Sequence, residues 1–186
     1  MKQLYRVCAA LLCLLLLSGC GSQGLSAKEI AAIDAEETYS DALICLAVYS
    51  SLDELYAAAD VVVEGVVRES TAGQRGYTQT TSQLEITRVL AGDCAAGDVL
   101  AVTEEGGTTT MGRFTYLGVP PMEPDGQYLL FLTKQDEQGR RFVVGAFQGK
   151  FVLREGYYFQ QATQEVKLSR EAYTPVPAAD FPTPDL

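Results

Sequence analysis

The stretch Asp-Val-Val-Val-Glu-Gly-Val-Val, residues 60–67, decides the expected fold of this chain. Valine branches at Cβ and favours extended backbone, so the run predicts a β-strand. Strand side chains alternate between two faces, which places Val61, Val63 and Val67 on one face and the other valines on the opposite face. Because both faces are apolar, we expect a strand that is buried on both sides. Gly65 in its middle favours a β-bulge or a sharp bend.

A second, longer strand is predicted for residues 77–90, where apolar and polar side chains alternate. The side chains of Leu84, Ile86 and Leu90 should share one face, and Glu85 should lie on the other. One apolar and one polar face are typical of an antiparallel strand that covers a core and meets solvent. We therefore expect Leu84 and Ile86 to share one core with the odd-numbered valines of the first strand.

Further short strands and one long loop are predicted from the rest of the chain. Residues 104–126 are rich in Gly, Thr and Pro and predict an irregular loop, and Glu155-Gly156 is typical of a tight hairpin turn. The remaining strands are expected at residues 99–103, 127–133, 142–147, 150–154, 157–160 and 166–168. Antiparallel strands in this number need closure or a second sheet to hide their edges. The expected fold class is therefore mainly β, a small closed or nearly closed antiparallel barrel.

One or two short helices are expected ahead of the barrel. Ser51 and Glu54 have the spacing of a capping box, which predicts a helix over residues 51–59. Residues 28–37 are rich in Ala and carry two isoleucines at helical spacing, which indicates a short amphipathic helix.

Three segments of the chain look like the core strands of bacterial OB-like domains, which are related in shape to netrin modules and tissue inhibitors of metalloproteinases. They are residues 59–67, 87–92 and 126–132, and the similarity covers about residues 50–160. The resemblance implies an OB-like β-barrel. The inhibitors act through an unmodified amino-terminal cysteine and several disulfides, and this chain departs from them on both counts. Protease inhibition is therefore kept as an alternative function only.

The amino-terminal region resembles a bacterial lipoprotein signal. Lys2 and Arg6 precede an apolar stretch that ends in Leu-Ser-Gly-Cys, residues 17–20, and this stretch is too short to span a bilayer. The resemblance implies that a lipid is attached to Cys20 and that the chain is cut just before it. The alternatives are an ordinary secretory peptide and a retained single helix. The expected location is extracytoplasmic, on the membrane, with acyl chains as the anchor.

These segments give the expected organisation of the chain. A signal peptide at 1–19 is followed by a tether with a short helix at 20–41, and the OB-like barrel domain spans 42–172 with its amino-terminal helix at 51–59. Four of the seven prolines fall within residues 173–186, which predict a disordered, Pro-rich tail.

The charge of the chain restricts its partners. There are 24 acidic against 14 basic residues, a formal net charge of −10. Binding to nucleic acid is disfavoured, because a polyanion would approach against the field of the protein. The same field disfavours adhesion to anionic lipid through the protein surface. The expected partners are the membrane, through the lipid anchor, and an envelope protein or a glycan.

Two cysteines, Cys45 and Cys94, remain once the signal peptide and the lipidated Cys20 are set aside. In an oxidising compartment they could form a disulfide that closes a loop of about 50 residues. The alternative is a pair of small buried thiols. Two cysteines without histidine do not make a usual zinc site, so no metal site is expected.

The chain contains no histidine, which excludes Ser-His-Asp and Cys-His catalysis and histidine-ligated zinc hydrolases. Phosphate-binding and dinucleotide-binding glycine motifs are missing from the sequence as well. Four acids flank the expected loop, and they are interpreted as solvated side chains, with a carboxylate pair or a calcium site as alternatives: Glu104, Glu105, Glu123 and Asp125. No enzyme activity, catalytic residue or cofactor is therefore expected, and a carboxylate-dependent glycan hydrolase is the third-ranked function.

Aromatic side chains gather in the second half of the chain, where they could fill the barrel or form a stacking surface. Consecutive strand residues cannot both point inward, so Tyr157 and Tyr158 are candidates for an exposed ligand-binding face, together with Tyr116. The leading functional prediction is a membrane-anchored extracytoplasmic lipoprotein whose non-catalytic β-barrel binds or scaffolds an envelope component.

Overall fold

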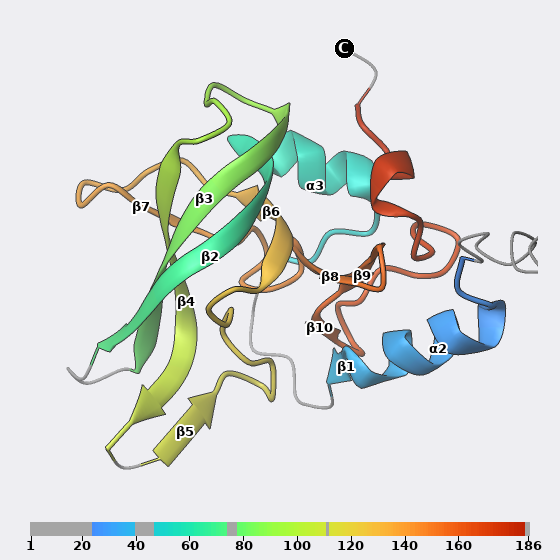
Figure 1. Ribbon diagram of the computed structural model, residues 1–186, viewed down its shortest axis with the longest axis horizontal. Helices are drawn as coiled ribbons and strands as arrows, with labels where there is room; N and C mark the ends of the chain where they lie inside the picture. Colours follow the sequence, from blue (N-terminus) through green and yellow to red (C-terminus); the bar gives the residue numbers. More distant parts are fainter. Residues whose placement is uncertain (1–23, 40–46, 74–77, 111, 185–186) are drawn as a thin grey trace, which may run out of the picture.

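The computed structural model describes residues 24–39, 47–73, 78–110 and 112–184 (Figure 1). Within them lie the helices α2 (Ala27–Glu36) and α3 (Leu52–Ala58) and a 3₁₀ turn, η1 (Ala178–Asp180). The strands are β1 (Thr38–Tyr39), β2 (Val61–Gly73), β3 (Gln79–Ala91), β4 (Val99–Thr109), β5 (Gly112–Thr115), β6 (Gln127–Leu132), β7 (Arg140–Phe142), β8 (Lys150–Arg154), β9 (Tyr157–Gln160) and β10 (Ala162–Thr163).

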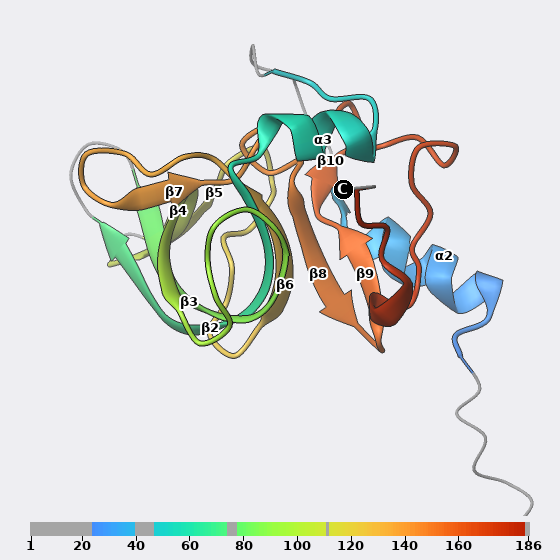
Figure 2. The same ribbon diagram turned by 90° about the horizontal axis from the view of Figure 1, so that it is seen from above.

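The larger sheet has the strand order β5-β4-β3-β2-β6-β8-β9, and its neighbours pair antiparallel. It curls strongly, so that β2, β3, β4 and β6 form a half-barrel that is seen in Figure 2. The short β7 pairs in parallel with β4, and a bridge joins Leu132 at the end of β6 to Val143. The prediction of a mainly β fold with short helices is confirmed.

The strand β2 follows the predicted alternation. Val61, Val63 and Val67 lie in the core inside the half-barrel, which we call the inner cluster, whereas Val62 lies in a second cluster on the opposite face. The register with β3 shifts between Glu64 and Gly65. A Cβ at Gly65 would lie 2.7 Å from the carbonyl oxygen of Glu85, so only glycine lets the strands approach this closely.

The strand β3 contributes to both clusters. Leu84 and Ile86 are buried in the inner cluster, as predicted. Leu90 lies instead in the cluster on the opposite face, so the prediction that it shares a face with Leu84 is wrong. Two register shifts between Ile86 and Ala91 each add a residue to β3, and an added residue exchanges the faces of the side chains beyond it.

The loop predicted at 104–126 is wrong in its first half. There β4 continues to Thr109 and turns into β5, which pairs with it from Gly106–Thr115 to Thr109–Gly112. Gly106 and Gly107 have φ of 99° and 147°, and a Cβ on Gly106 would lie 2.8 Å from the carbonyl oxygen of Phe114. These glycines permit close strand pairing rather than marking a loop.

The second cluster, called the outer cluster, lies on the opposite face of β6 and β8, under α3 and the carboxy-terminal segment (Figure 2). Its buried members come from α3, from the strands β2, β3, β6, β8 and β9, from the β7–β8 connection and from the carboxy-terminal segment: Leu52, Leu55, Val62, Leu90, Leu129, Phe131, Val144, Phe151, Tyr158, Leu168, Tyr173 and Phe181. Tyr173 and Phe181 belong to the segment predicted to be a disordered tail. That expectation is wrong for residues 173–184, because their aromatic side chains are buried in the outer cluster. The proline content of the segment gave no indication of this burial.

Local signals at the helices and turns agree with the structure. The Ser51 hydroxyl accepts a bond from the Glu54 backbone N–H at the start of α3, as the capping pattern predicts. Helix α2 has a full capping box, formed by Ser26 and Glu29. The hairpin turn at Glu155-Gly156 is confirmed, with φ of 49° and 81° at its two residues.

Two predicted strands have different bounds. The strand expected at 142–147 exists only as β7 at Arg140–Phe142, and the following residues turn. Residues 166–168 form no strand, whereas the preceding Ala162–Thr163 forms β10, which pairs in parallel with β1. Both segments are apolar because they pack into cores, and packing alone does not require strand backbone.

Candidate functional site

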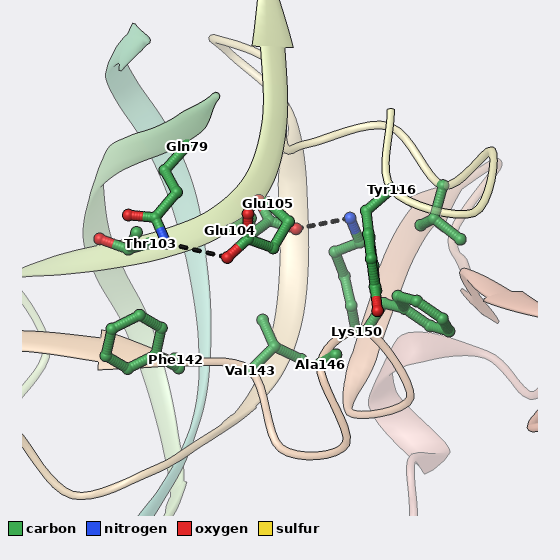
Figure 3. A pocket seen from close by; sticks show the side chains of 11 residues that line it. Gln79, Thr103, Glu104, Glu105, Tyr116, Phe142, Val143, Ala146 and Lys150 are labelled. Atoms are coloured by element: carbon green, nitrogen blue, oxygen red, sulfur yellow. Dashed lines mark hydrogen bonds and ion pairs between the residues drawn. The ribbon is translucent and has the colours of Figure 1, made fainter. Parts of the chain in front are cut away.

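A cavity of about 490 Å³ opens between the middle of β4 and the connection from β7 to β8 (Figure 3). Its volume lies in the usual range for small-ligand sites. The wall is mostly apolar, with several polar side chains on one side. The lining residues are Gln79, Thr103, Glu104, Glu105, Tyr116, Val119, Phe142, Val143, Ala146, Phe147 and Lys150.

A buried ion pair forms the polar side of this cavity. The Lys150 ammonium donates to Glu104 Oε1 at 2.6 Å and to the carbonyl oxygen of Pro120 at 2.7 Å. Glu104 Oε2 accepts a bond from the Met122 backbone N–H at 2.8 Å. The side chains of Lys150 and Glu104 are 1% and 5% exposed. The pair therefore ties β4, β8 and the 120–122 segment together.

The rim of the cavity holds a second polar group. The Gln79 amide donates to Glu105 Oε1 at 2.8 Å, and the Glu105 side chain is exposed. Figure 3 shows Glu104 directed to Lys150 and Glu105 directed to Gln79. The two neighbouring carboxylates thus have different partners, as expected for adjacent residues on a strand.

Aromatic rings and fixed turns shape the apolar wall. The rings of Tyr116 and Phe147 lie 6.2 Å apart at a tilt of 52°. Ala146 lines the cavity with φ of 63°, a left-handed conformation that is rare outside glycine. The turn that carries Ala146 is held by Gln148, whose buried amide bonds the backbone of Tyr49 and the carbonyl oxygen of Val166. The wall is therefore pre-formed, since buried hydrogen bonds hold its backbone.

The structure separates the three tyrosines that were predicted to form one ligand-binding face. Tyr116 lines the cavity and is half-buried. Tyr157 is half-buried on β9, against the inner cluster. Tyr158 is only 2% exposed and packs in the outer cluster, so the prediction of its exposure is wrong. The alternation itself holds, but both faces of β9 are covered by other parts of the chain.

The four acids of the predicted loop are also separated. Glu104 is buried in its ion pair, so its interpretation as a solvated loop acid is wrong. Glu105 is exposed at the cavity rim, while Glu123 and Asp125 line a different hollow. Among the residues that the structure describes, no group of three or more His, Cys, Asp or Glu side chains is placed to hold a metal ion.

Of the three cysteines in these predictions, the described residues include only Cys94. Cys94 is half-buried beside the inner cluster, and burial raises the pKa of its thiol, which keeps it in the less reactive protonated form. Cys20 and Cys45 lie outside the described residues, so the lipid attachment and the disulfide stay predictions. No helix within the described ranges is both long enough and apolar enough to cross a bilayer.

A second hollow, of about 640 Å³, lies between α2 and the carboxy-terminal segment. Its charged groups hold the chain together: Lys167 forms an ion pair with Asp34 at 3.0 Å and donates to Thr38 Oγ1 at 2.6 Å. These contacts attach α2 to the body of the protein. Arg170 and Tyr173 also line this hollow.

Sequence reasoning missed Lys150 and Phe147 as site residues. Lys150 begins a strand that was predicted correctly, but its burial beside an acid 46 positions away has no local signature. One signal was available, because a lysine that starts an apolar strand and points inward needs a buried partner. Comparisons with protein-family models, with curated protein sequences and with solved structures gave no match to this chain.

Proposed function

We propose that this protein is a lipid-anchored extracytoplasmic binding module with an OB-like half-barrel. The strands β2, β3, β4, β6 and β7 correspond in this proposal to the five strands of an OB-like barrel. The position of β7 supports it, because β7 pairs with β4 and the bridge Leu132–Val143 connects it to the end of β6. The segment that contains β7 thereby connects β4 to the end of β6 across the open side of the curled sheet.

The cavity beside β4 is the observation that carries the binding function. It combines aromatic and aliphatic walls with a hydrogen-bonding rim, and it is held in shape by the Lys150–Glu104 pair. In this proposal the ligand is an apolar group, or the flat face of a ring, that belongs to a glycan or a protein segment of the envelope. Tyr116 and Phe147 would pack on that group, and Gln79 and Glu105 would bond its polar edge.

The hydrogen bonds of the buried Lys150–Glu104 pair favour a non-catalytic role. Both carboxylate oxygens of Glu104 are bonded inside the protein, and Lys150 donates to Glu104 and to a backbone carbonyl. A catalytic acid or base has to reach the substrate at hydrogen-bond distance. Here the pair holds the wall, so the alternative functions of protease inhibitor and glycan hydrolase gain no support from it.

The lipid anchor is tested by Cys20→Ala in the native host. Loss of the acceptor thiol should release the protein from the membrane fraction or block its processing, as measured by fractionation and mass spectrometry. Unchanged membrane retention together with normal cleavage would contradict the anchor.

The cavity is tested by placing the photo-crosslinker p-benzoylphenylalanine at Tyr116 in the membrane-bound protein. Illumination should give an adduct, and its sensitivity to protease or to glycan-cleaving enzymes identifies the ligand class. The matched control carries the same crosslinker at Tyr157, which lies outside the cavity. Adducts at 157 and none at 116 would show that the cavity is not the binding site.

A further inference from the structure

The strand β5 forms an open edge of the large sheet. It ends the strand order beyond β4, and its four residues, Gly112–Thr115, are all exposed. The opposite end of the sheet is covered by the carboxy-terminal segment, since the backbone N–H of Tyr158 on β9 donates to the carbonyl oxygen of Val176 at 3.3 Å. Within the described residues, the backbone of β5 has no hydrogen-bonded strand other than β4.

The direction of the free backbone groups of β5 follows from its partner. The N–H of Gly106 donates to the carbonyl oxygen of Thr78 at 2.6 Å, so it points toward β3 and away from β5. Hydrogen-bonded and non-hydrogen-bonded pairs alternate along an antiparallel ladder. Gly106–Thr115 is therefore a non-hydrogen-bonded pair, and the N–H and C=O groups of Thr115 and Arg113 face outward.

An outward row of N–H and C=O groups is a template for one more strand. Phe114 adds an apolar contact beside this row, because its side chain remains 42% exposed. Native proteins usually protect such an edge with lysines, prolines or a covering segment. Gly112–Thr115 holds neither lysine nor proline, and its one charged side chain, Arg113, is paired with Glu123, so the edge is suited to an added strand.

The charge around the edge selects the kind of strand that fits it. The single positive side chain of β5, Arg113, is paired with Glu123 at 3.0 Å. Glu105 is exposed on β4, next to the position that pairs with Thr115. The local excess is therefore negative, like the net charge of −10 on the whole chain. A second copy of this chain would bring the same negative charge to the edge, whereas a basic segment would be attracted.

We propose that the free edge of β5 binds an extended, basic segment of a partner protein as an additional β-strand. Main-chain hydrogen bonds to Arg113 and Thr115 would supply the affinity, and the acidic side chains would select the basic partner. This surface lies outside the cavity, and its use depends on neither the lipid anchor nor the cavity ligand.

The test uses the purified full-length chain and a fluorescein-labelled peptide of eight residues in which lysine and valine alternate. Fluorescence anisotropy should show binding to the wild type that is at least about tenfold tighter than binding of the matched glutamate–valine peptide. The preference should weaken as salt is raised, because the attraction is between exposed charges. Equal affinity for both peptides, or no binding up to millimolar peptide, would overturn the proposal.

The variant Thr115→Pro tests the main-chain bonds directly. Proline removes the outward N–H of residue 115 and is tolerated on an edge strand. Binding of the lysine peptide should fall about tenfold or more, while the control Thr115→Val, which keeps the N–H, should bind like wild type. Circular dichroism of both variants checks that the fold is kept. Equal binding by Thr115→Pro and Thr115→Val would show that no strand is added, and a concentration-dependent dimer in sedimentation would assign the edge to a second copy instead.

Discussion

The two clusters on either side of the sheet are built in different ways. The inner cluster is mainly aliphatic and comes from alternating positions of neighbouring strands, such as Val61, Val63 and Ile86. The outer cluster is rich in aromatic rings and is assembled from segments far apart in the chain, with Phe181 in contact with four other rings. Strand periodicity organises most of the first, whereas the second depends on how the chain returns after its last strand.

The largest test of this difference is Phe181→Ala. The ring of Phe181 lies 5.4 Å from that of Phe151 and 5.6 Å from that of Tyr158, and the side chain is 4% exposed. Its removal should lower the free energy of unfolding by about 3–5 kcal/mol, because it leaves a cavity at the centre of the rings. Urea melts measure the change, with Phe114→Ala at an exposed position as the control. A loss similar to that of the control would mean that the carboxy-terminal segment does not stabilise the domain.

The buried ion pair is expected to have a comparable effect. Lys150→Met leaves Glu104 buried without its cation, which should cost about 3–5 kcal/mol. The double variant with Glu104→Leu removes the stranded charge as well and should recover most of that loss. Thermal or urea melts of the two variants and the wild type give the comparison. Additive losses in the double variant would show that the two side chains act independently.

Ile86→Ala tests the inner cluster. The side chain of Ile86 is 2% exposed inside the half-barrel, so truncation should cost about 2–5 kcal/mol. Its neighbour Glu85 points to the other face and pairs with Arg68 at 2.8 Å near the surface, so Glu85→Ala should cost under about 1 kcal/mol. Denaturant melts measure both. Equal losses would mean that the facing of β3 is wrong.

The smallest effect concerns the hydroxyl of Tyr173, which donates to the carbonyl oxygen of Tyr158 at 2.6 Å. Tyr173→Phe should lower the free energy of unfolding by about 1 kcal/mol at neutral pH. Burial raises the pKa of Tyr173 well above its usual value, so below about pH 10 the hydroxyl is neutral in the folded and unfolded states alike. At higher pH the unfolded chain ionises first, and stability falls as pH rises toward the folded-state pKa.

Because the variant lacks this group, its free energy of unfolding should fall less between about pH 9 and pH 11 than that of the wild type. Melts at several pH values, with tyrosinate absorbance followed in parallel, check the difference. Parallel pH profiles for the variant and the wild type would contradict a buried, neutral Tyr173. Tyr128 provides a reference in the inner cluster, where burial raises the pKa to about 12.

The success of sequence reasoning follows the range of the interactions involved. The facing of the valines in β2, the register shift at Gly65, the cap at Ser51 and the turn at Glu155 are set by neighbours within a few residues. The β4–β5 hairpin was missed although it is local, because glycines are read as loop residues. In this hairpin they let two backbones approach closely.

The candidate site was less accessible to sequence reasoning. Tyr116 was singled out for its ring, and it does line the cavity, but Tyr157 and Tyr158 were grouped with it and lie elsewhere. Glu104 was noted as an acid, while its buried partner Lys150 was not. The sequence shows which side chains are present, but it does not show which of them come into contact in the fold.

The sequence by itself determined most of the strands, the inward-facing side chains of β2 and the net negative charge, because alternation and charge are properties of consecutive residues and of composition. The tertiary structure alone decided the cavity, the outer cluster and the open edge. Lys150 meets Glu104 across 46 positions, Phe181 completes a core that begins on α3, and the outer edge of β5 has no partner strand among the described residues. These contacts depend on how the sheet curls and where the chain returns, and no local pattern encodes either.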